Sequence, residues 1–367
     1  MTKDAGPPIA TPAGKDAAGQ RLAAIDGWRA ISVGLVILFH ASFSFSFPIG
    51  PSLEAGLRTW LSSLGILGVH IFFVISGYVI TRGMTGEESE TGRVSLIGFY
   101  VRRVFRILPP LLLYVLTILL LTSIEAIPEY GFGAARALTF TCNFPDADCG
   151  HWTAAHTWSL SVEEQFYLVA PVFFVLTRRW RGIASVVAFI ALVLASNWAP
   201  NFSYIAAGVM FASNEQVLVR VARKIPLWVV LAMIAAMLVC ARALLSQYAW
   251  VSIALQGSLI AAILMTTTYG DNLFRKMLSA RWLVAVGQAS YGIYLWQQLA
   301  TAREFATTPL AMAILLLAAI VSSLVSYNTW ERALIRLSRR ISTNLRSSSR
   351  VVRPGDVTEK ANKSLAD

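Results

Sequence analysis

The chain has 367 residues, of which 56% are hydrophobic and only 14% are charged, and its formal net charge is +11. A mean hydropathy of +0.60 excludes an ordinary water-soluble domain and predicts a protein that spans a lipid bilayer. The positive charge does not require a nucleic-acid partner, because membrane orientation accounts for most of it, as described below.

The two ends of the chain are polar. Residues 1–21 are rich in Pro, Gly and Ala and contain no apolar run typical of a cleaved signal peptide, so we expect a disordered cytoplasmic leader. Residues 337–367 are basic and rich in Ser, and we expect a cytoplasmic tail too small to form a second domain. A single membrane domain is therefore expected over residues 22–336.

Apolar segments long enough to cross a bilayer recur along this domain. They lie at about Ala30–Phe47, Leu64–Ile80, Ile107–Ser123, Trp158–Leu176, Ile183–Trp198, Phe202–Ala212, Leu227–Leu245, Val251–Thr268, Leu283–Ala300 and Pro309–Trp330. The sixth is the shortest and is the weakest candidate. The pattern predicts an all-α polytopic membrane protein with about ten transmembrane helices.

The connections between these segments differ strongly in charge. If the N-terminus is cytoplasmic, 27 of the 31 Lys and Arg residues fall on cytoplasmic segments, and only Arg58, Arg136, Arg242 and Arg303 fall outside. Positive residues are retained on the cytoplasmic side of membrane proteins. Both termini are therefore predicted to be cytoplasmic.

The first apolar segment contains His40 and is directly preceded by Arg29, and both residues are costly to bury in a membrane. Eleven helical steps make about three turns, so both side chains lie on nearly the same face, about 16 Å apart along the axis. An ionisable group in such a segment usually faces a cavity and marks a functional site. The alternative is a histidine that is bonded to a neighbouring helix for structural reasons.

An arginine cluster precedes the third segment. Arg102, Arg103 and Arg106 come just before the pair Pro109–Pro110, and Arg103 and Arg106 share a helical face because they are three residues apart. Two guanidinium groups at that spacing suit phosphate binding. The alternative is ordinary anchoring at the cytoplasmic membrane surface.

Two adjacent carboxylates, Glu163 and Glu164, enter the fourth segment from the outer side. Glu163 is expected at nearly the depth of His40, so a contact between a histidine and a carboxylate is possible there. Adjacent helical positions differ by about 100°, so only one of the two carboxylates can face His40. A structural hydrogen-bond network is the alternative.

The connection before this segment contains Cys142 and Cys149 on the side predicted to be extracytoplasmic. That compartment permits a disulfide, but two free thiols are an equally valid interpretation of the sequence. His151 and His156, near Asp146 and Asp148, form only a weak metal-binding pattern, and no metal is expected.

Six motifs, in order from residue 25 to about residue 336, together resemble the acyltransferase-3 family of membrane acyltransferases. They read IDGWRAISVGLVILFH, GVHIFFVISGYVITR, FYVRRVFRILPP, HTWSLSVEEQFYLVAP, ASYGIYLWQQ and NTWERALIR. The resemblance implies a ten-helix enzyme of the bacterial cytoplasmic membrane. Such an enzyme moves an acyl group, usually acetyl from acetyl-CoA, to a hydroxyl of a sugar, surface polysaccharide or glycolipid.

Matched position by position, the resemblance assigns five residues. It implies catalytic roles for His40 and Glu163, and binding of the acyl-CoA phosphates by Arg29, Arg103 and Arg106. In two places the chain departs from the common family pattern. His70 stands where relatives commonly have Asp, and Gln297 stands where they commonly have His, so no role is assigned to either residue.

The residues and the resemblance together predict a mechanism. Acyl-CoA enters from the cytosol, and His40 acts as general base on the acceptor hydroxyl or takes the acyl group itself, while Glu163 sets the tautomer of His40. A proton-coupled transporter with a buried His/Glu site is the alternative from another class, and a purely structural membrane protein is a third. Thioester cleavage separates the enzyme from both.

Overall fold

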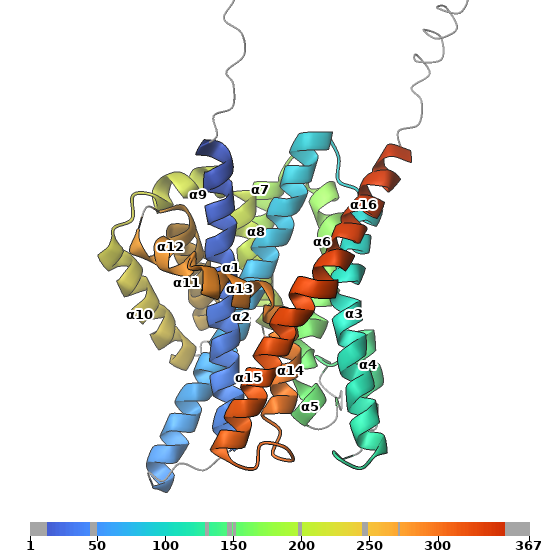
Figure 1. Ribbon diagram of the computed structural model, residues 1–367. Coiled ribbons are helices and arrows are strands. Elements are labelled where there is room, and N and C mark those ends of the chain that lie inside the picture. Colours follow the sequence, from blue (N-terminus) through green and yellow to red (C-terminus); the bar gives the residue numbers. More distant parts are fainter. Residues whose placement is uncertain are drawn as a thin grey trace, which may run out of the picture.

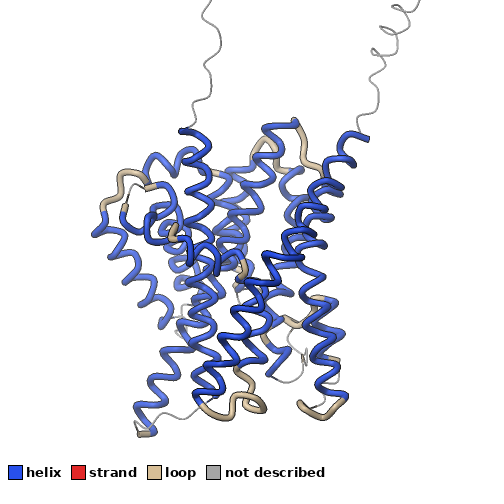
Figure 2. Tube along the Cα trace, in the orientation of Figure 1, coloured by secondary structure: helices blue, strands red, loops and turns tan. Residues whose placement is uncertain are grey.

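The computed structural model describes residues 13–44, 50–128, 132–144, 149, 152–196, 200–243, 249–270 and 272–348, without the side chains of residues 13–22, 242–243 and 346–348. All regular structure in these ranges is helical, and no strand occurs in them (Figure 2). The predicted all-α class is therefore confirmed. The predicted leader and tail fall largely on residues 1–12 and 349–367, outside the described part of the chain.

The described residues form sixteen α-helices and one π-helix (Figure 1). Their bounds are α1 Ala13–Ser44, α2 Pro51–Thr91, α3 Leu96–Ser123, α4 Gly133–Thr139, α5 Trp152–Ala155, α6 Thr157–Leu176, α7 Arg181–Leu194, α8 Pro200–Ser213, α9 Glu215–Ala222, α10 Leu227–Ala243, α11 Ala249–Tyr269, α12 Leu273–Leu278, α13 Arg281–Gln288, α14 Ser290–Ala300, α15 Pro309–Ser326, the π-helix Tyr327–Glu331 and α16 Arg332–Ser348.

Six stretches of helix in the described ranges are long and apolar enough to cross a membrane. They are Ala23–Ser44, Pro51–Thr91, Leu96–Ser123, Trp152–Leu176, Ala249–Tyr269 and Pro309–Leu345. A seventh is possible if α9 and α10, which meet at an angle of 114°, count as one span. The other predicted segments are also helical, but α7, α8, α13 and α14 are short. Multiple membrane-spanning helices are thus present, whereas the number ten stays a prediction.

The helices define two ends of the bundle. The start of α1 and the end of α16 lie at the same end, together with the junction between α2 and α3 (Figure 1). We call this the terminal end. The start of α2, α4 and the connection between α14 and α15 lie at the other end, which we call the opposite end (Figure 1).

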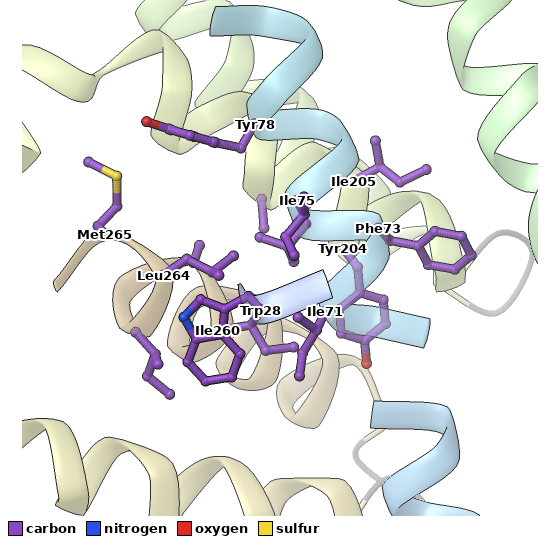
Figure 3. Close-up of a cluster of buried hydrophobic side chains, with 14 of the residues drawn as sticks. Trp28, Ile71, Phe73, Ile75, Tyr78, Tyr204, Ile205, Ile260, Leu264 and Met265 are labelled. Atoms are coloured by element: carbon purple, nitrogen blue, oxygen red, sulfur yellow. The ribbon is translucent and has the colours of Figure 1, made fainter. Parts of the chain in front are cut away.

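The main core joins α1, α2, α8 and α11. One buried cluster contains Trp28 of α1, Ile71 and Ile75 of α2, Ile205 of α8 and Ile260 of α11, all of them nearly or fully buried (Figure 3). The indole of Trp28 also donates a hydrogen bond of 2.9 Å to the hydroxyl of Thr267. Because α1 is fixed in this core, the C-terminal half of the same helix holds Arg29 and His40 in defined positions.

Two glycines allow α2 and α8 to touch. A Cβ atom on Gly77 would lie 2.1 Å from the carbonyl oxygen of Ile205, and one on Gly208 would lie 2.1 Å from that of Val74. Small residues at such crossings let helix backbones approach closely within a membrane. This contact fixes α2, which carries Ser76, next to the functional cavity described below.

Cys142 and Cys149 form a disulfide, with their Cα atoms 5.4 Å apart. Of the two interpretations that the sequence left open, the structure shows the bonded one. Cys149 lies three residues before Trp152, so the bridge holds the chain next to the start of α5.

Candidate functional site

A buried cavity of about 90 Å³ lies between α1, α2, α3, α6 and α14. Four of the five residues predicted for the site line it, namely Arg29, Arg103, Arg106 and Glu163. These residues come from three helices and from positions up to 134 apart in the sequence. We call this space the arginine cavity.

Arg29 forms an ion pair with an acidic residue one turn earlier on α1. Its guanidinium lies 3.5 Å from the carboxylate of Asp26, which also accepts a hydrogen bond of 3.3 Å from the side chain of Gln288 on α13. A buried cation needs such a partner because its desolvation is costly. The Asp26 contact therefore positions Arg29 without using all five of its N–H donors.

Arg103 and Arg106 both reach the arginine cavity, as their spacing on α3 predicts. The guanidinium of Arg103 lies over the ring of Tyr167, 4.8 Å from its centroid, and near Phe99 at 5.6 Å. Among the described carboxylates, none lies within ion-pair distance of Arg103 or Arg106. Two partly buried cations that form no direct ion pair are an arrangement suited to an anionic ligand.

Glu163 faces the same cavity and is held by two hydroxyl groups. Ser76 of α2 donates a hydrogen bond of 2.5 Å to its carboxylate, and Tyr167 donates another from one turn along α6. The hydroxyls of Ser76 and Tyr167 also lie 2.7 Å apart. The three side chains form a compact polar cluster opposite the arginines.

His40 lies deeper in the bundle, is 8% exposed, and bonds to a residue that the sequence did not identify as its partner. Its Nδ1 lies 3.0 Å from Oε1 of Gln297 on α14. The predicted contact between His40 and Glu163 does not form, because Glu163 is engaged by Ser76 and Tyr167. Equal depth in the membrane does not bring two groups together unless both helices also turn those faces toward each other.

The orientation of the Gln297 amide fixes the tautomer of His40. The Nε2 group of Gln297 donates to the carbonyl oxygen of Tyr294 at 3.3 Å and to Oε1 of Gln298 at 3.1 Å. Its Oε1 therefore points to His40 and can only accept, so Nδ1 of His40 carries the proton. The other ring nitrogen, Nε2, then keeps its lone pair and can act as a base.

One turn of α14 connects His40 to the arginine cavity. Tyr294 lines that cavity, and Gln297, which holds His40, follows three residues later on the same helix. The Tyr294 hydroxyl lies 2.6 Å from that of Ser159 and donates to the carbonyl oxygen of His156 at 2.9 Å. We call His40, His156, Tyr294 and Gln297 the histidine layer.

A wider space opens at the terminal end. It has a volume of about 910 Å³, it is lined by parts of α2, α3, α9 and α16, and Arg103 belongs to both this space and the arginine cavity. Arg82, Arg102 and Arg339 add positive charge to its wall, where Arg102 is paired with Glu87 at 2.8 Å. We call it the vestibule.

Sequence reasoning missed four residues of this site, Ser76, Tyr167, Tyr294 and Gln297. The sequence contained part of this information. Tyr167 is one helical turn from Glu163, and Gln297 is one helical turn from Tyr294, so the members of each pair share a face of their helix. His70, the other residue that departs from the family pattern, lies outside this site. Its Nδ1 is 2.9 Å from the side-chain oxygen of Gln256, and its ring stacks on the ring of Tyr204 with the centroids 3.7 Å apart.

The described residues contain no group of three or more His, Cys, Asp or Glu side chains that could hold a metal ion. Of the weak metal-binding pattern near residue 150, Asp146, Asp148 and His151 lie outside the described residues. The remaining member, His156, belongs to the histidine layer.

Comparison with known proteins finds a family and related curated proteins, but no solved structure. A family model described as "Acyltransferase domain" matches residues 22–330. The O-acetyltransferase OatA of Staphylococcus aureus strain NCTC 8325 is 33% identical over 162 residues, and OatA of strain COL is equally similar. The match covers 41% of this chain but only 24% of each relative's length. No solved structure matches the chain.

Proposed function

The chain belongs to the acyltransferase-3 family, and on that basis we propose that it is a membrane O-acyltransferase. It moves an acyl group, acetyl in the simplest case, from acyl-CoA to a hydroxyl of a sugar-containing acceptor such as a surface polysaccharide or glycolipid. The name of the matched relatives, O-acetyltransferase, supports the choice of oxygen as acceptor atom and acetyl as the group. The observation that carries the proposal is the meeting of three half-buried arginines with the histidine layer in one cavity.

The donor binds from the terminal end. The vestibule, at about 910 Å³, has room for the nucleotide of acyl-CoA, whereas the arginine cavity, at about 90 Å³, holds only a narrow part of the molecule. Arg103 lies on both, so it meets the phosphates at the passage between them, and Arg29 and Arg106 bind them from the inner side. The pantetheine arm then points toward Tyr294 and His40.

His40 supplies the base. Because Gln297 holds the proton on Nδ1, Nε2 of His40 takes the proton from the acceptor hydroxyl. The hydroxyl oxygen attacks the thioester carbonyl carbon, the new C–O bond forms, and the C–S bond breaks. Coenzyme A leaves as a thiolate and receives the proton from the His40 imidazolium, which restores the neutral histidine.

Glu163 has a different role from the one predicted for it. Since it bonds Ser76 and Tyr167 and not His40, we assign it to electrostatic positioning of the arginine cavity. Its negative charge partly balances Arg29, Arg103 and Arg106 while the cavity is empty and keeps them extended into it. It is thus a positioning residue.

The two ends of the bundle then face different compartments. We place the terminal end in the cytosol, where acyl-CoA is made, and the opposite end outside the cytoplasmic membrane of a bacterium. Two observations support this orientation, namely the excess of Lys and Arg on the segments of the terminal end and the disulfide between Cys142 and Cys149 near α5.

The first experiment measures release of the coenzyme A thiol from acetyl-CoA by membrane vesicles supplied with crude envelope glycans. The wild type is expected to release thiol, and His40→Ala is expected to lose at least a hundredfold in rate. His70→Ala is the matched control, because it removes another buried histidine that lies outside the arginine cavity. Equal rates in wild type and His40→Ala would refute the proposal, and so would a wild type that folds but cleaves no acyl-CoA in the presence of these glycans.

A further inference from the structure

A second cavity, of about 280 Å³, lies at the opposite end of the bundle. It is built from the last turn of α1, from α5 and from the chain that follows α14 (Figure 1). Its lining residues are Phe43, Ser44, Trp152, Thr301, Arg303 and Glu304. None of them lines the arginine cavity, so the two spaces are separate. We call it the Trp152 cavity.

The walls of this cavity are both aromatic and polar, and they are held in place. The rings of Phe43 and Trp152 lie 6.1 Å apart, and the guanidinium of Arg303 donates two hydrogen bonds, of 2.7 and 3.2 Å, to the carbonyl oxygen of Phe43. The hydroxyl of Ser44 donates to the carbonyl oxygen of Thr301 at 2.8 Å. Aromatic faces with a few fixed polar groups are typical of small-molecule sites.

Unsatisfied polar atoms are concentrated beside this cavity. Ten buried side-chain polar atoms in the described residues have no hydrogen-bond partner, and four of them belong to the five-residue segment from Trp152 to His156. They are Nε1 of Trp152, Oγ1 of Thr153 and both ring nitrogens of His156. Thr153 and His156 are 0% and 3% exposed, respectively, so water does not satisfy them from the surface.

Leaving such buried atoms unpaired is destabilising, so their gathering on one short segment calls for an explanation. The neighbouring rings of Tyr114 and Tyr294, at 5.6 and 5.2 Å from the His156 ring, offer the imidazole nitrogens of His156 no hydrogen bond. Of the four unpaired atoms, only Nε1 of Trp152 belongs to a residue that lines the Trp152 cavity, where a ligand that carries hydroxyl groups would accept a hydrogen bond from it.

The Trp152 cavity is also next to the proposed base. The ring of Trp152 meets the ring of His40 edge-on, with the centroids 5.3 Å apart. A molecule that occupies the cavity is therefore separated from His40 by a single aromatic ring.

Resting on the proposed function, we propose that the Trp152 cavity binds one sugar ring of the acceptor. Its volume of about 280 Å³ gives room for a single sugar ring and is less than a third of the volume of the vestibule assigned to acyl-CoA. The flat apolar face of the sugar packs against Trp152, one sugar oxygen accepts a hydrogen bond from Nε1 of Trp152, and other hydroxyls meet the polar groups of Arg303 and Glu304 in the same wall.

The test measures sugar binding without any acyl-CoA. The full chain in lipid nanodiscs is titrated with methyl glycosides of glucose, N-acetylglucosamine, mannose and rhamnose, and binding is followed by saturation-transfer NMR against empty nanodiscs. At least one glycoside is expected to bind. Trp152→Leu is expected to weaken that binding at least tenfold by removing the stacking face, and Trp152→Phe is expected to weaken it less, because it removes only the Nε1 donor.

Trp60→Leu is the matched control, because Trp60 lies on α2, is 47% exposed and lines neither cavity. It should bind the glycoside like the wild type. Acetyl-CoA binding and thermal unfolding, recorded on the same samples, show that each variant is folded. If no glycoside binds, or if Trp152→Leu and Trp152→Phe fold and bind like Trp60→Leu, the inference is wrong. Sugar binding by a wild type that neither binds nor cleaves acetyl-CoA supports the inference and refutes the proposed function instead.

Discussion

His40 and Gln297 lie 257 residues apart in the sequence and are joined by one hydrogen bond of 3.0 Å between α1 and α14. This bond links the first apolar helix to the last part of the matched family domain. It also decides which nitrogen of His40 is a base, because the Gln297 oxygen can only accept. The departure from the family pattern at residue 297 therefore falls at the partner of the proposed catalytic histidine.

Replacing Gln297 by Leu should lower kcat at least tenfold and leave the KM for acetyl-CoA unchanged. The tautomer and orientation of His40 are lost, whereas the arginine cavity is intact. Gln256→Leu is the matched control, since it breaks the equivalent bond between His70 and a glutamine. The control should reduce thermal stability and keep kcat in the folded fraction. A Gln297→Leu enzyme with wild-type kcat would show that the bond is not needed for catalysis.

Arg103→Ala and Arg106→Ala should each raise the KM for acetyl-CoA at least tenfold. A hydrogen bond to a charged group contributes about 1.5–3 kcal/mol, and both residues have a position on the arginine cavity. Steady-state thiol release over a range of acetyl-CoA concentrations measures the change. Arg220→Ala on α9 removes an exposed arginine outside both spaces and should leave KM unchanged. An unchanged KM in both cavity variants would remove the phosphate-binding role.

Gly77→Ala should destabilise the fold by about 2 kcal/mol or more, because its Cβ would meet the carbonyl oxygen of Ile205 at 2.1 Å and push α8 away from α2. Thermal unfolding in detergent micelles detects the loss. Gly56→Ala is the control on the same helix, at an exposed site with open space around the added carbon. If Gly77→Ala and Gly56→Ala unfold at the same temperature, the close crossing of α2 and α8 is not a stabilising contact.

The orientation of the bundle can be tested with introduced cysteines in a Cys240→Ala background. Ser52 and Ser89 are exposed residues near the two ends of α2. A membrane-impermeant maleimide applied to intact spheroplasts should label Ser52→Cys, at the opposite end. It should label Ser89→Cys, at the terminal end, only after the membrane is permeabilised. The reverse labelling pattern would overturn the proposed orientation.

Local spacing predicted those parts of the site that lie on one helix. Arg103 and Arg106 share a face of α3 because they are three positions apart in the sequence. Burying a cation against lipid is costly, so that face is expected to point into a polar cavity. Arg29 follows from the same reasoning. The structure brings all three to one cavity with Glu163.

The spacing of residues along the sequence could not predict contacts between different helices. The depth of Glu163 could be predicted from its distance to the membrane boundary, but the rotation of α6 could not, so its true partners Ser76 and Tyr167 were missed. The same holds for Gln297, whose approach to His40 depends on how α1 packs against α14. Hydropathy likewise placed helix within each of the ten predicted segments, but it did not predict the short helices α4, α9 and α12 or the polar helix α16. α7 and α8, with 14 residues each, are shorter than a full membrane crossing.

The histidine layer has one more consequence, for the electrical insulation of the membrane. The arginine cavity and the Trp152 cavity have no lining residue in common, and tightly packed rings lie between them. If acetyl is handed across this layer, only the small group travels, while the bulky, highly charged coenzyme stays on the side where it is made. The protein then exports a chemical modification without opening a conductive path, and a cell that produces it should keep its membrane potential.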